Sequence, residues 1–245
     1  MRLAQRAVLV SLVTVLIATA GRSADFSKGE TLDFTLEFLG IAAGNARMTI
    51  GPHVNDASHY LITSVAESTS GFSRIYRVRD GLESIVTPGD CSTVMFRKTL
   101  QEGGKSKEET TTIANGTATR KGKQVAVPKP VFDPLSILYY FRTLPLGEGR
   151  KFEIPVVADG KLYTLDVEVK GRERVSTPAG TFDALVVEPK SEMAGGVFRD
   201  EKNRMTIWYS ADSRHLPLKI KSELKFGSIT ATLNHVTDGV AGSSK

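Results

Sequence analysis

Residues 217–235, PLKIKSELKFGSITATLNH, alternate apolar and polar side chains in the pattern of two paired β-strands. The apolar face of the first strand carries Leu218, Ile220, Ser222, Leu224 and Phe226, and its other face carries Lys219, Lys221, Glu223 and Lys225. Gly227-Ser228 predicts the turn, and Ile229, Ala231 and Leu233 continue the apolar face beyond it. A period of two indicates strands with one buried and one solvated face.

The same period recurs along most of the chain. Segments of this kind, separated by Gly, Pro, Asn or Asp, predict strands at 30–38, 47–50, 59–67, 81–87, 92–101, 108–114, 117–121, 151–157, 161–170, 181–188 and 205–210. Gly103-Gly104 and Asn115-Gly116 supply the positive φ angles that tight turns need. We therefore predict a mostly β protein of about a dozen strands, in which a strongly curved antiparallel sheet forms an open barrel or spiral.

Residues 133–143, DPLSILYYFRT, interrupt the strand pattern. Asp133 suits a helix N-cap and Pro134 the first helical position, and the segment that follows is apolar on nearly every side. A helix that is apolar all round must be enclosed by other elements. The sequence therefore predicts one short helix packed on the concave side of the sheet.

The first twenty residues have the layout of a secretory signal peptide. Arg2 and Arg6 precede an uncharged run, residues 7–20, which ends in the small residues Ala18-Thr19-Ala20. We expect residues 1–20 to be cleaved, leaving residues 21–245 as a single β domain in the periplasm, with two sub-halves joined near residues 125–131. The uncharged run is shorter than the roughly 20 residues of a membrane-spanning helix, so no transmembrane segment is expected after cleavage.

Charge and residue counts exclude several function classes. Cleavage removes Arg2 and Arg6 and leaves 30 basic against 27 acidic side chains, a net charge of +3, which gives no support to nucleic-acid binding. The single cysteine, Cys91, cannot form an intramolecular disulfide, and the four histidines are scattered. We therefore assign no catalytic residue, metal ligand or cofactor. An envelope polymer hydrolase would require carboxylates or histidines that are distant in sequence to converge.

Two segments stand out for their composition. Residues 92–130 carry eight basic and three acidic side chains, which indicates either a face attracted to anionic lipid head groups or lysines that protect sheet edges from aggregation. Met193, Val197 and Phe198 flank Gly195-Gly196 and predict either a flap over a cavity or a plain hairpin loop.

Four further stretches carry a family resemblance. They are Phe132-Asp133-Pro134-Leu135-Ser136, Thr177-Pro178-Ala179-Gly180-Thr181-Phe182-Asp183-Ala184, Met205-Thr206-Ile207-Trp208-Tyr209-Ser210 and Leu216-Pro217-Leu218-Lys219-Ile220. Together they resemble a bacterial family of secreted envelope proteins catalogued as a domain of unknown function. Such proteins look like periplasmic lipoprotein carriers and envelope-integrity factors, in which a bent sheet half-closes around a short helix. The resemblance implies that fold and carries over no catalytic residue.

The leading functional hypothesis is a non-enzymatic periplasmic factor that supports cell-envelope integrity by binding an apolar ligand, a lipid or lipoprotein segment, in the concave hollow. The candidate lining residues are Phe34, Phe38, Leu138, Tyr139, Phe141 and Trp208. The alternative is a structural or scaffolding module that binds an envelope protein partner or the membrane surface. These two hypotheses differ in whether the hollow is open or filled by its own side chains.

Overall fold

The computed structural model describes residues 24–74, 77–102, 105–190, 204–225 and 227–239. Their strands are β1 (Glu30–Phe38), β2 (Ile41–His53), β3 (Asp56–Ser68), β4 (Arg79–Val86), β5 (Thr93–Glu102), β6 (Lys105–Ala114), β7 (Thr117–Arg120), β8 (Lys123–Ala126), β9 (Lys151–Ala158), β10 (Lys161–Thr177), β11 (Gly180–Lys190), β12 (Met205–Ser210), β13 (Pro217–Leu224) and β14 (Gly227–Asp238). The helices in these residues are the 3-10 helix η1 (Phe72–Arg74) and the α-helix α1 (Ser136–Thr143). The predicted mostly β fold with one short α-helix is therefore confirmed.

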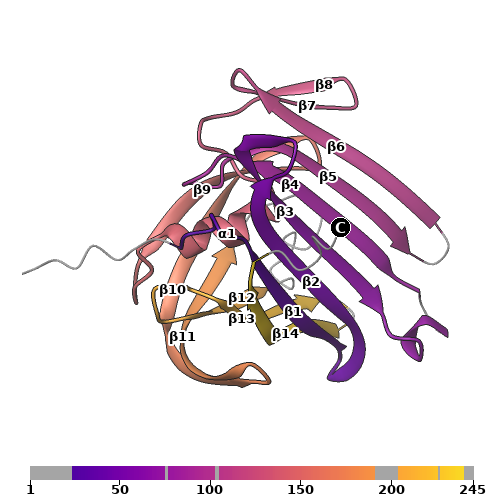
Figure 1. Cartoon of the computed structure of the whole chain (residues 1–245), viewed down its shortest axis with the longest axis vertical. Coiled ribbons are helices and arrows are strands. Elements are labelled where there is room, and N and C mark those ends of the chain that lie inside the picture. Colours follow the sequence, from indigo (N-terminus) through magenta and orange to yellow (C-terminus); the bar gives the residue numbers. More distant parts are fainter. Residues whose placement is uncertain (1–23, 75–76, 103–104, 191–203, 226, 240–245) are drawn as a thin grey trace, which may run out of the picture.

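All fourteen strands belong to one antiparallel sheet (Figure 1). Its order is β8-β7-β6-β5-β4-β3-β2-β1-β14-β13-β12-β11-β10-β9. Each half of the chain is thus a meander of sequential strands, and the two halves join where β1 pairs with β14. The strand order leaves β8 and β9 as the two edges, so the sheet is curved but not closed.

The segment between the halves connects β5 to the edge strand β9. The amide of Thr93 in β5 donates to the carbonyl of Val131 at 2.9 Å. One residue on, Phe132 forms a parallel bridge to β9, with its amide donating to Pro155 at 3.0 Å and its carbonyl accepting from Val157 at 2.7 Å. Val131 and Phe132 therefore connect the two halves by backbone hydrogen bonds without closing the sheet.

The helix lies inside the curve of the sheet, as Figure 1 shows. Its helical residues begin at Ser136, two residues later than the predicted first helical residue, Pro134, and Leu135 occupies the N-cap position without a side-chain cap. Asp133 still performs part of the predicted function, because its Oδ1 accepts hydrogen bonds from the amides of Leu135 at 2.7 Å and Ser136 at 2.9 Å. Asp133 therefore caps the start of the helix, although it lies two residues before the N-cap position.

Every predicted strand segment overlaps a strand of the sheet, and the elements that sequence analysis missed are the strand β8 and the 3-10 helix η1. Val125, assigned to the linker because prolines follow it, pairs with Ala118 of β7. The predicted turn at Asn115-Gly116 is confirmed, with φ angles of 50° and 70°. The turn after β13 lies earlier than predicted, because Leu224 already pairs with Gly227. Gly103-Gly104 lies outside the described residues.

Gly44 in β2 is held against the neighbouring strand. A Cβ built on Gly44 would lie 2.4 Å from the backbone carbonyl oxygen of Glu67, a contact that side-chain movement cannot relieve. We expect Gly44→Ala to lower the free energy of unfolding by about 1–3 kcal/mol, the usual cost of overpacking, as measured by urea unfolding. Gly81→Ala is the matched control, since a Cβ on Gly81 of β4 meets nothing within 4 Å. Equal stability of the two variants would contradict the predicted clash.

Candidate functional site

The helix fills one end of the curved sheet with aromatic side chains. Tyr139 and Phe141 are almost completely buried, and Tyr140 stacks on Phe132 with ring centroids 4.1 Å apart. Phe141 meets Tyr209 of β12 edge-on at 6.1 Å, and the Tyr209 hydroxyl donates to the carbonyl of Leu138 at 3.0 Å. Along the helix, this end of the sheet is therefore a core packed with aromatic side chains.

A buried carboxylate connects the start of the helix to the first half of the sheet. Asp133 accepts hydrogen bonds from Ser84 Oγ of β4 at 2.9 Å and from Thr93 Oγ1 of β5 at 2.7 Å, in addition to the two amides before the helix. Burial raises the pKa of the Asp133 carboxyl, and these donated hydrogen bonds oppose that rise. Four donors converging on one side chain indicate an anchor that sets the position of the helix.

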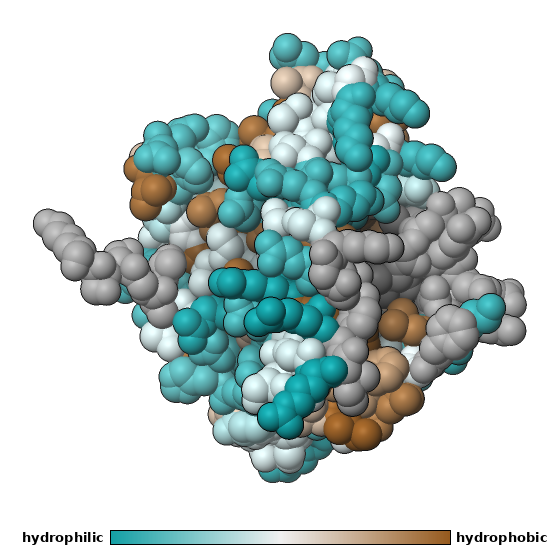
Figure 2. Space-filling view, turned by 90° about the vertical axis from the view of Figure 1, so that its right-hand side faces the viewer, coloured by the Kyte–Doolittle hydropathy of each residue, from teal (hydrophilic) through white to brown (hydrophobic). Residues whose placement is uncertain are grey.

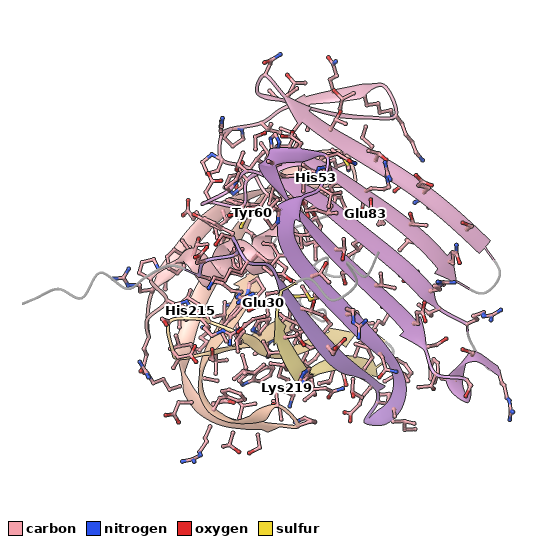
Figure 3. All side chains as sticks on the ribbon, viewed as in Figure 1. Glu30, His53, Tyr60, Glu83, His215 and Lys219 are labelled. Atoms are coloured by element: carbon pink, nitrogen blue, oxygen red, sulfur yellow. The ribbon has the colours of Figure 1, made fainter. Side chains whose placement is uncertain are left out.

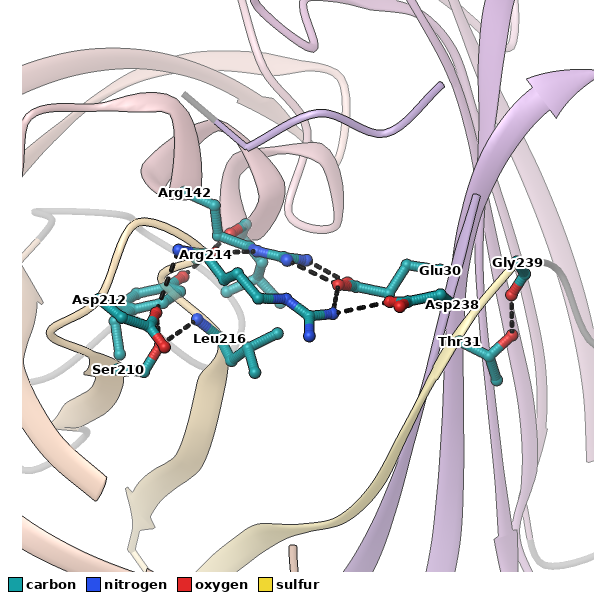
Figure 4. Close-up of polar contacts among 11 residues, drawn as sticks. Glu30, Thr31, Arg142, Ser210, Asp212, Arg214, Leu216, Asp238 and Gly239 are labelled. Carbon is teal, nitrogen blue, oxygen red and sulfur yellow. Dashed lines mark hydrogen bonds and ion pairs between the residues drawn. The ribbon is translucent and has the colours of Figure 1, made fainter. Parts of the chain in front are cut away.

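A second polar anchor holds the other end of the helix (Figure 4). The Arg142 guanidinium donates to both carboxylate oxygens of Glu30 in β1, at 2.5 and 2.9 Å, and lies over the ring of Phe26. Arg214 reaches the same carboxylate at 3.0 Å and Asp238 of β14 at 3.1 Å. Burial works to raise the pKa of the Glu30 carboxyl, but the hydrogen bonds and charges of the two arginines hold the pKa below its usual value. The helix is thus fixed to the strand pair that joins the two halves.

Away from the helix, the inward-facing side chains are less deeply buried. Along β1, Leu32 and Phe34 are buried, but the next inward residue, Leu36, is only half-buried. The register places Leu36 opposite Ala231 of β14, and Ala231 opposite Ile220 of β13, and both of these are half-buried as well. Half-buried apolar residues continue on the other side of β1. We define the inner apolar surface as Leu36, Ala46, Leu82, Ile220 and Ala231.

The residues predicted to line a hollow lie mostly in or against the packed core. Phe34, Tyr139 and Phe141 belong to the packed core, and Leu138 of α1 is half-buried beside it. Phe38 lies at the far end of β1, where the sheet opens.

Trp208, also predicted as a lining residue, alternates with Ile207 and Tyr209 along β12, and its partly buried side chain packs against the core cluster that contains Phe34 and Tyr139. Its Nε1 donates to Glu173 at 2.7 Å, and the Lys219 ammonium lies 5.1 Å from its ring centre. The predicted flap residues Met193, Val197 and Phe198 lie outside the described residues.

The inner apolar surface was visible in the sequence but was not chosen as the site. Leu36, Ile220 and Ala231 all occupy the apolar positions of strands that the alternation predicted. The prediction selected aromatic side chains instead, and the structure uses most of those to fill the core. A better signal is the position along a strand, since apolar residues beyond the reach of the short helix are the ones left only partly buried.

The basic stretch at residues 92–130 is largely paired with acidic side chains. The Glu109 carboxylate lies beneath Arg120 at 2.5 Å, Lys121 at 2.9 Å, Lys107 at 3.1 Å and Lys98 at 3.7 Å. Burial acts to raise the pKa of the Glu109 carboxyl, but hydrogen bonds from Arg120, Lys121 and Lys107 lower this pKa below its usual value. This cluster therefore holds β5, β6 and β7 together. Because Glu109 offsets part of the positive charge of these side chains, the case for an anion-binding face is weaker.

A depression of about 640 Å³ at β9–β11 offers a poor apolar site. Its lining residues are Lys151, Phe152, Glu153, Asp166, Val167, Glu168 and Lys190. Five of these seven side chains are charged, so the depression favours water over an apolar chain.

The described residues contain no strong candidate for catalysis. Burial raises the pKa of the Cys91 thiol to about 12, which leaves no reactive thiolate near neutral pH. His59 pairs with Asp56 at an exposed turn, and His215 contacts the carbonyl of Arg142. Within the described part of the chain, no three His, Cys, Asp or Glu side chains form a group that could hold a metal ion.

Comparisons with known proteins support the fold. The family described as "Protein of unknown function (DUF3108)" matches residues 33–234. A solved β-barrel-like protein of the DUF1849 domain of unknown function, from Brucella abortus, aligns over 86% of this chain and 97% of its own, with 9% identity and a TM-score of 0.57. At this identity the likeness shows the fold alone.

Two further solved structures align over most of the chain but with low scores. A candidate exported protein with a YmcC-like fold from Bacteroides fragilis covers 88% of this chain and 98% of its own, with 10% identity and a TM-score of 0.34. A candidate lipoprotein from Parabacteroides distasonis covers 87% and 97%, with 10% identity and a TM-score of 0.33. No curated protein matches the sequence. Among the described residues, no helix has the length and apolar character to cross a membrane.

Proposed function

Because this chain belongs to the DUF3108 family of proteins of unknown function, and because inward-facing apolar side chains beyond the helix are only partly buried, we propose that it binds an apolar ligand there without catalysing a reaction. The ligand is a lipid acyl chain or a lipoprotein segment, and the protein acts in the periplasm to support the cell envelope. The signal-like residues 1–20 support that location.

The observation that carries this proposal is the change in burial along single strands. The inward residues of β1 pass from buried at Leu32 and Phe34 to half-buried at Leu36, without any change in their apolar character. Burying an acyl chain on such a surface gains about 0.8 kcal/mol for each methylene removed from water. A chain of ordinary lipid length could therefore be held by contact with the inner apolar surface alone.

Native mass spectrometry of the mature protein purified from the periplasm, followed by lipid extraction, tests this function. We expect a reproducible bound mass that organic extraction releases. A clean apo mass that stays unchanged when envelope lipids are added would contradict the proposal and favour the scaffolding alternative, with a protein partner.

A pair of variants locates the ligand. Leu36→Glu introduces a carboxylate into the inner apolar surface, where contact with an acyl chain would desolvate it, so we expect bound lipid to fall by about tenfold or more. Val65→Glu makes a comparable change on the outer face of β3, where Val65 lies opposite Arg47, and it should leave the bound lipid unchanged. Equal lipid loss in both variants, measured in the same extraction, would exclude the inner apolar surface as the binding site.

A further inference from the structure

A cluster of exposed and partly buried apolar side chains lies where the concave sheet opens. Phe38 of β1 pairs with Ile41 of β2 and with Ile229 of β14, and its ring meets Phe72 of η1 edge-on at 6.4 Å. Leu39 forms the turn between β1 and β2. We define these five residues, Phe38, Leu39, Ile41, Phe72 and Ile229, as the rim cluster. Through Phe38 and Leu36, which share one face of β1, the rim cluster continues into the inner apolar surface.

The rim cluster exposes apolar area at the tip of a hairpin. Leu39 is 58% exposed, Ile41 68% and Ile229 40%. Figure 1 places the β1–β2 turn at the lower end of the molecule, and Figure 2 shows hydrophobic side chains gathered at that end. Contiguous exposed apolar residues of this kind mark a surface that contacts a partner or a membrane.

The turn adopts an unfavourable conformation that presents a leucine. Leu39 and Gly40 both have positive φ angles, 53° and 78°, as a two-residue hairpin turn requires. Glycine or asparagine adopts such an angle with little strain, whereas a leucine pays a steric cost there. Its side chain leans on Gly227 in β14, where a Cβ would lie 2.7 Å from Leu39 Cδ2. A large apolar residue thus stands at the tip of the turn although its backbone is strained and its side chain is exposed.

The chain beside the rim cluster is basic. Residues 69–79 include Arg74, Arg77 and Arg79 and no acidic residue. Arg79 pairs with Glu67 at 2.9 Å. Arg74 and Arg77 are exposed, and among the described residues neither has an ion-pair partner. Exposed apolar side chains flanked by unpaired arginines match the surface of an anionic bilayer, whose head groups attract the cations while its acyl region accepts the apolar tip.

We propose that the rim cluster docks the open end of the sheet on an anionic phospholipid bilayer, with Leu39 and Ile41 entering the interface and Arg74 and Arg77 contacting head groups. Docking there brings the inner apolar surface next to the membrane. The proposal goes beyond ligand binding and does not depend on it, because the rim cluster can contact the bilayer whether or not a ligand is bound to the inner apolar surface.

Vesicle co-sedimentation of the lipid-stripped mature protein tests the docking. Binding should be strong to vesicles of phosphatidylethanolamine and phosphatidylglycerol and weak to phosphatidylcholine vesicles. Ile41→Asp should lower the partition constant by about tenfold or more. The matched control is Val54→Asp: Val54 is 89% exposed in the β2–β3 turn beside His53, which Figure 3 shows at the upper end of the molecule. That variant should bind like the wild type. Equal binding by the two variants would overturn the proposal.

Two further variants separate docking from folding and from ligand binding. Leu39→Asn relieves the strained angle, so it should keep or raise the Tm and still reduce vesicle binding; undiminished binding would count against the proposal. Leu36→Glu should lose its lipid and bind vesicles normally, so the failure of one proposal is distinguishable from the failure of the other. The opposite outcome is a wild-type protein that does not bind vesicles but forms a dimer in sedimentation velocity, and an Ile41→Asp variant that is monomeric. This result would assign the rim cluster to contact with a second copy and overturn membrane docking.

Discussion

Replacing Arg142 by methionine should lower the free energy of unfolding by about 3–5 kcal/mol, because the substitution leaves the buried Glu30 carboxylate without its main partner. Arg142 is 2% exposed and makes two hydrogen bonds to Glu30. An isolated charge in such a site must be desolvated without compensation. Urea unfolding can be followed through the single tryptophan, Trp208.

Two variants control for other causes. Arg214→Ala removes the half-exposed partner of the same carboxylate and should cost about 1 kcal/mol or less. The double variant Glu30→Gln with Arg142→Met removes both charges and should be more stable than Arg142→Met alone. If Arg142→Met costs no more than Arg214→Ala, the buried pair does not hold the helix as described.

The same pair predicts the response to acid. The pKa of Glu30 is lowered in the folded protein from 4.5, so its contribution to stability is complete above pH 4.5 and is lost as the pH falls toward the folded-state pKa. The double variant lacks this group, so its stability should fall less between those two pKa values. A parallel loss of stability in both proteins would assign acid sensitivity to other carboxylates.

Asp133→Ala should cost about 3–4 kcal/mol, since it removes the acceptor of four buried donors. These are the hydroxyls of Ser84 and Thr93 and the amides of Leu135 and Ser136. Asp133→Asn keeps one carbonyl oxygen for the amides but presents an amino group to the remaining donors, so its stability should be intermediate. Both variants are measured by urea unfolding.

Asp90→Ala is the matched control for this carboxylate. Asp90 also accepts one hydroxyl, from Thr87, and one amide, from Ser92, but in an exposed turn where water can replace it. We expect a cost of about 1 kcal/mol there. A similar cost at Asp133 would show that burial adds nothing to the value of its hydrogen bonds.

The alternation of side chains predicted the strands and their faces because a strand with one buried and one solvated face carries apolar and polar residues in turn. Ile220 and Ala231 were placed on one apolar face, and the structure pairs them directly. No local sequence pattern indicates the pairing of β1 with β14, because that pairing joins residues about two hundred positions apart. Glu30 and Arg142 likewise look like ordinary charged residues in the sequence, and only the fold brings them together.

The candidate site was less predictable than the fold. Large aromatic residues are the natural choice for lining a hollow, but they also bury the most area, and a single short helix needs them to fill the core. Phe34, Tyr139 and Phe141 are used in this way. Which apolar positions remain half-exposed depends on how far α1 extends along the sheet, and that length became clear only with the helix beginning at Ser136.

The position of β1 between β2 and β14 has a consequence for biosynthesis. Synthesis proceeds from the N-terminus, so β1 can pair with β2 early, while its other edge stays bare until residues 227–238 have been made. A bare apolar strand edge is a template for pairing with other chains. Until that last strand is available, the unpaired edge of β1 is a site where the incomplete sheet can associate with other chains. The yield of folded protein and the stability of the finished sheet are thus determined by different parts of the chain.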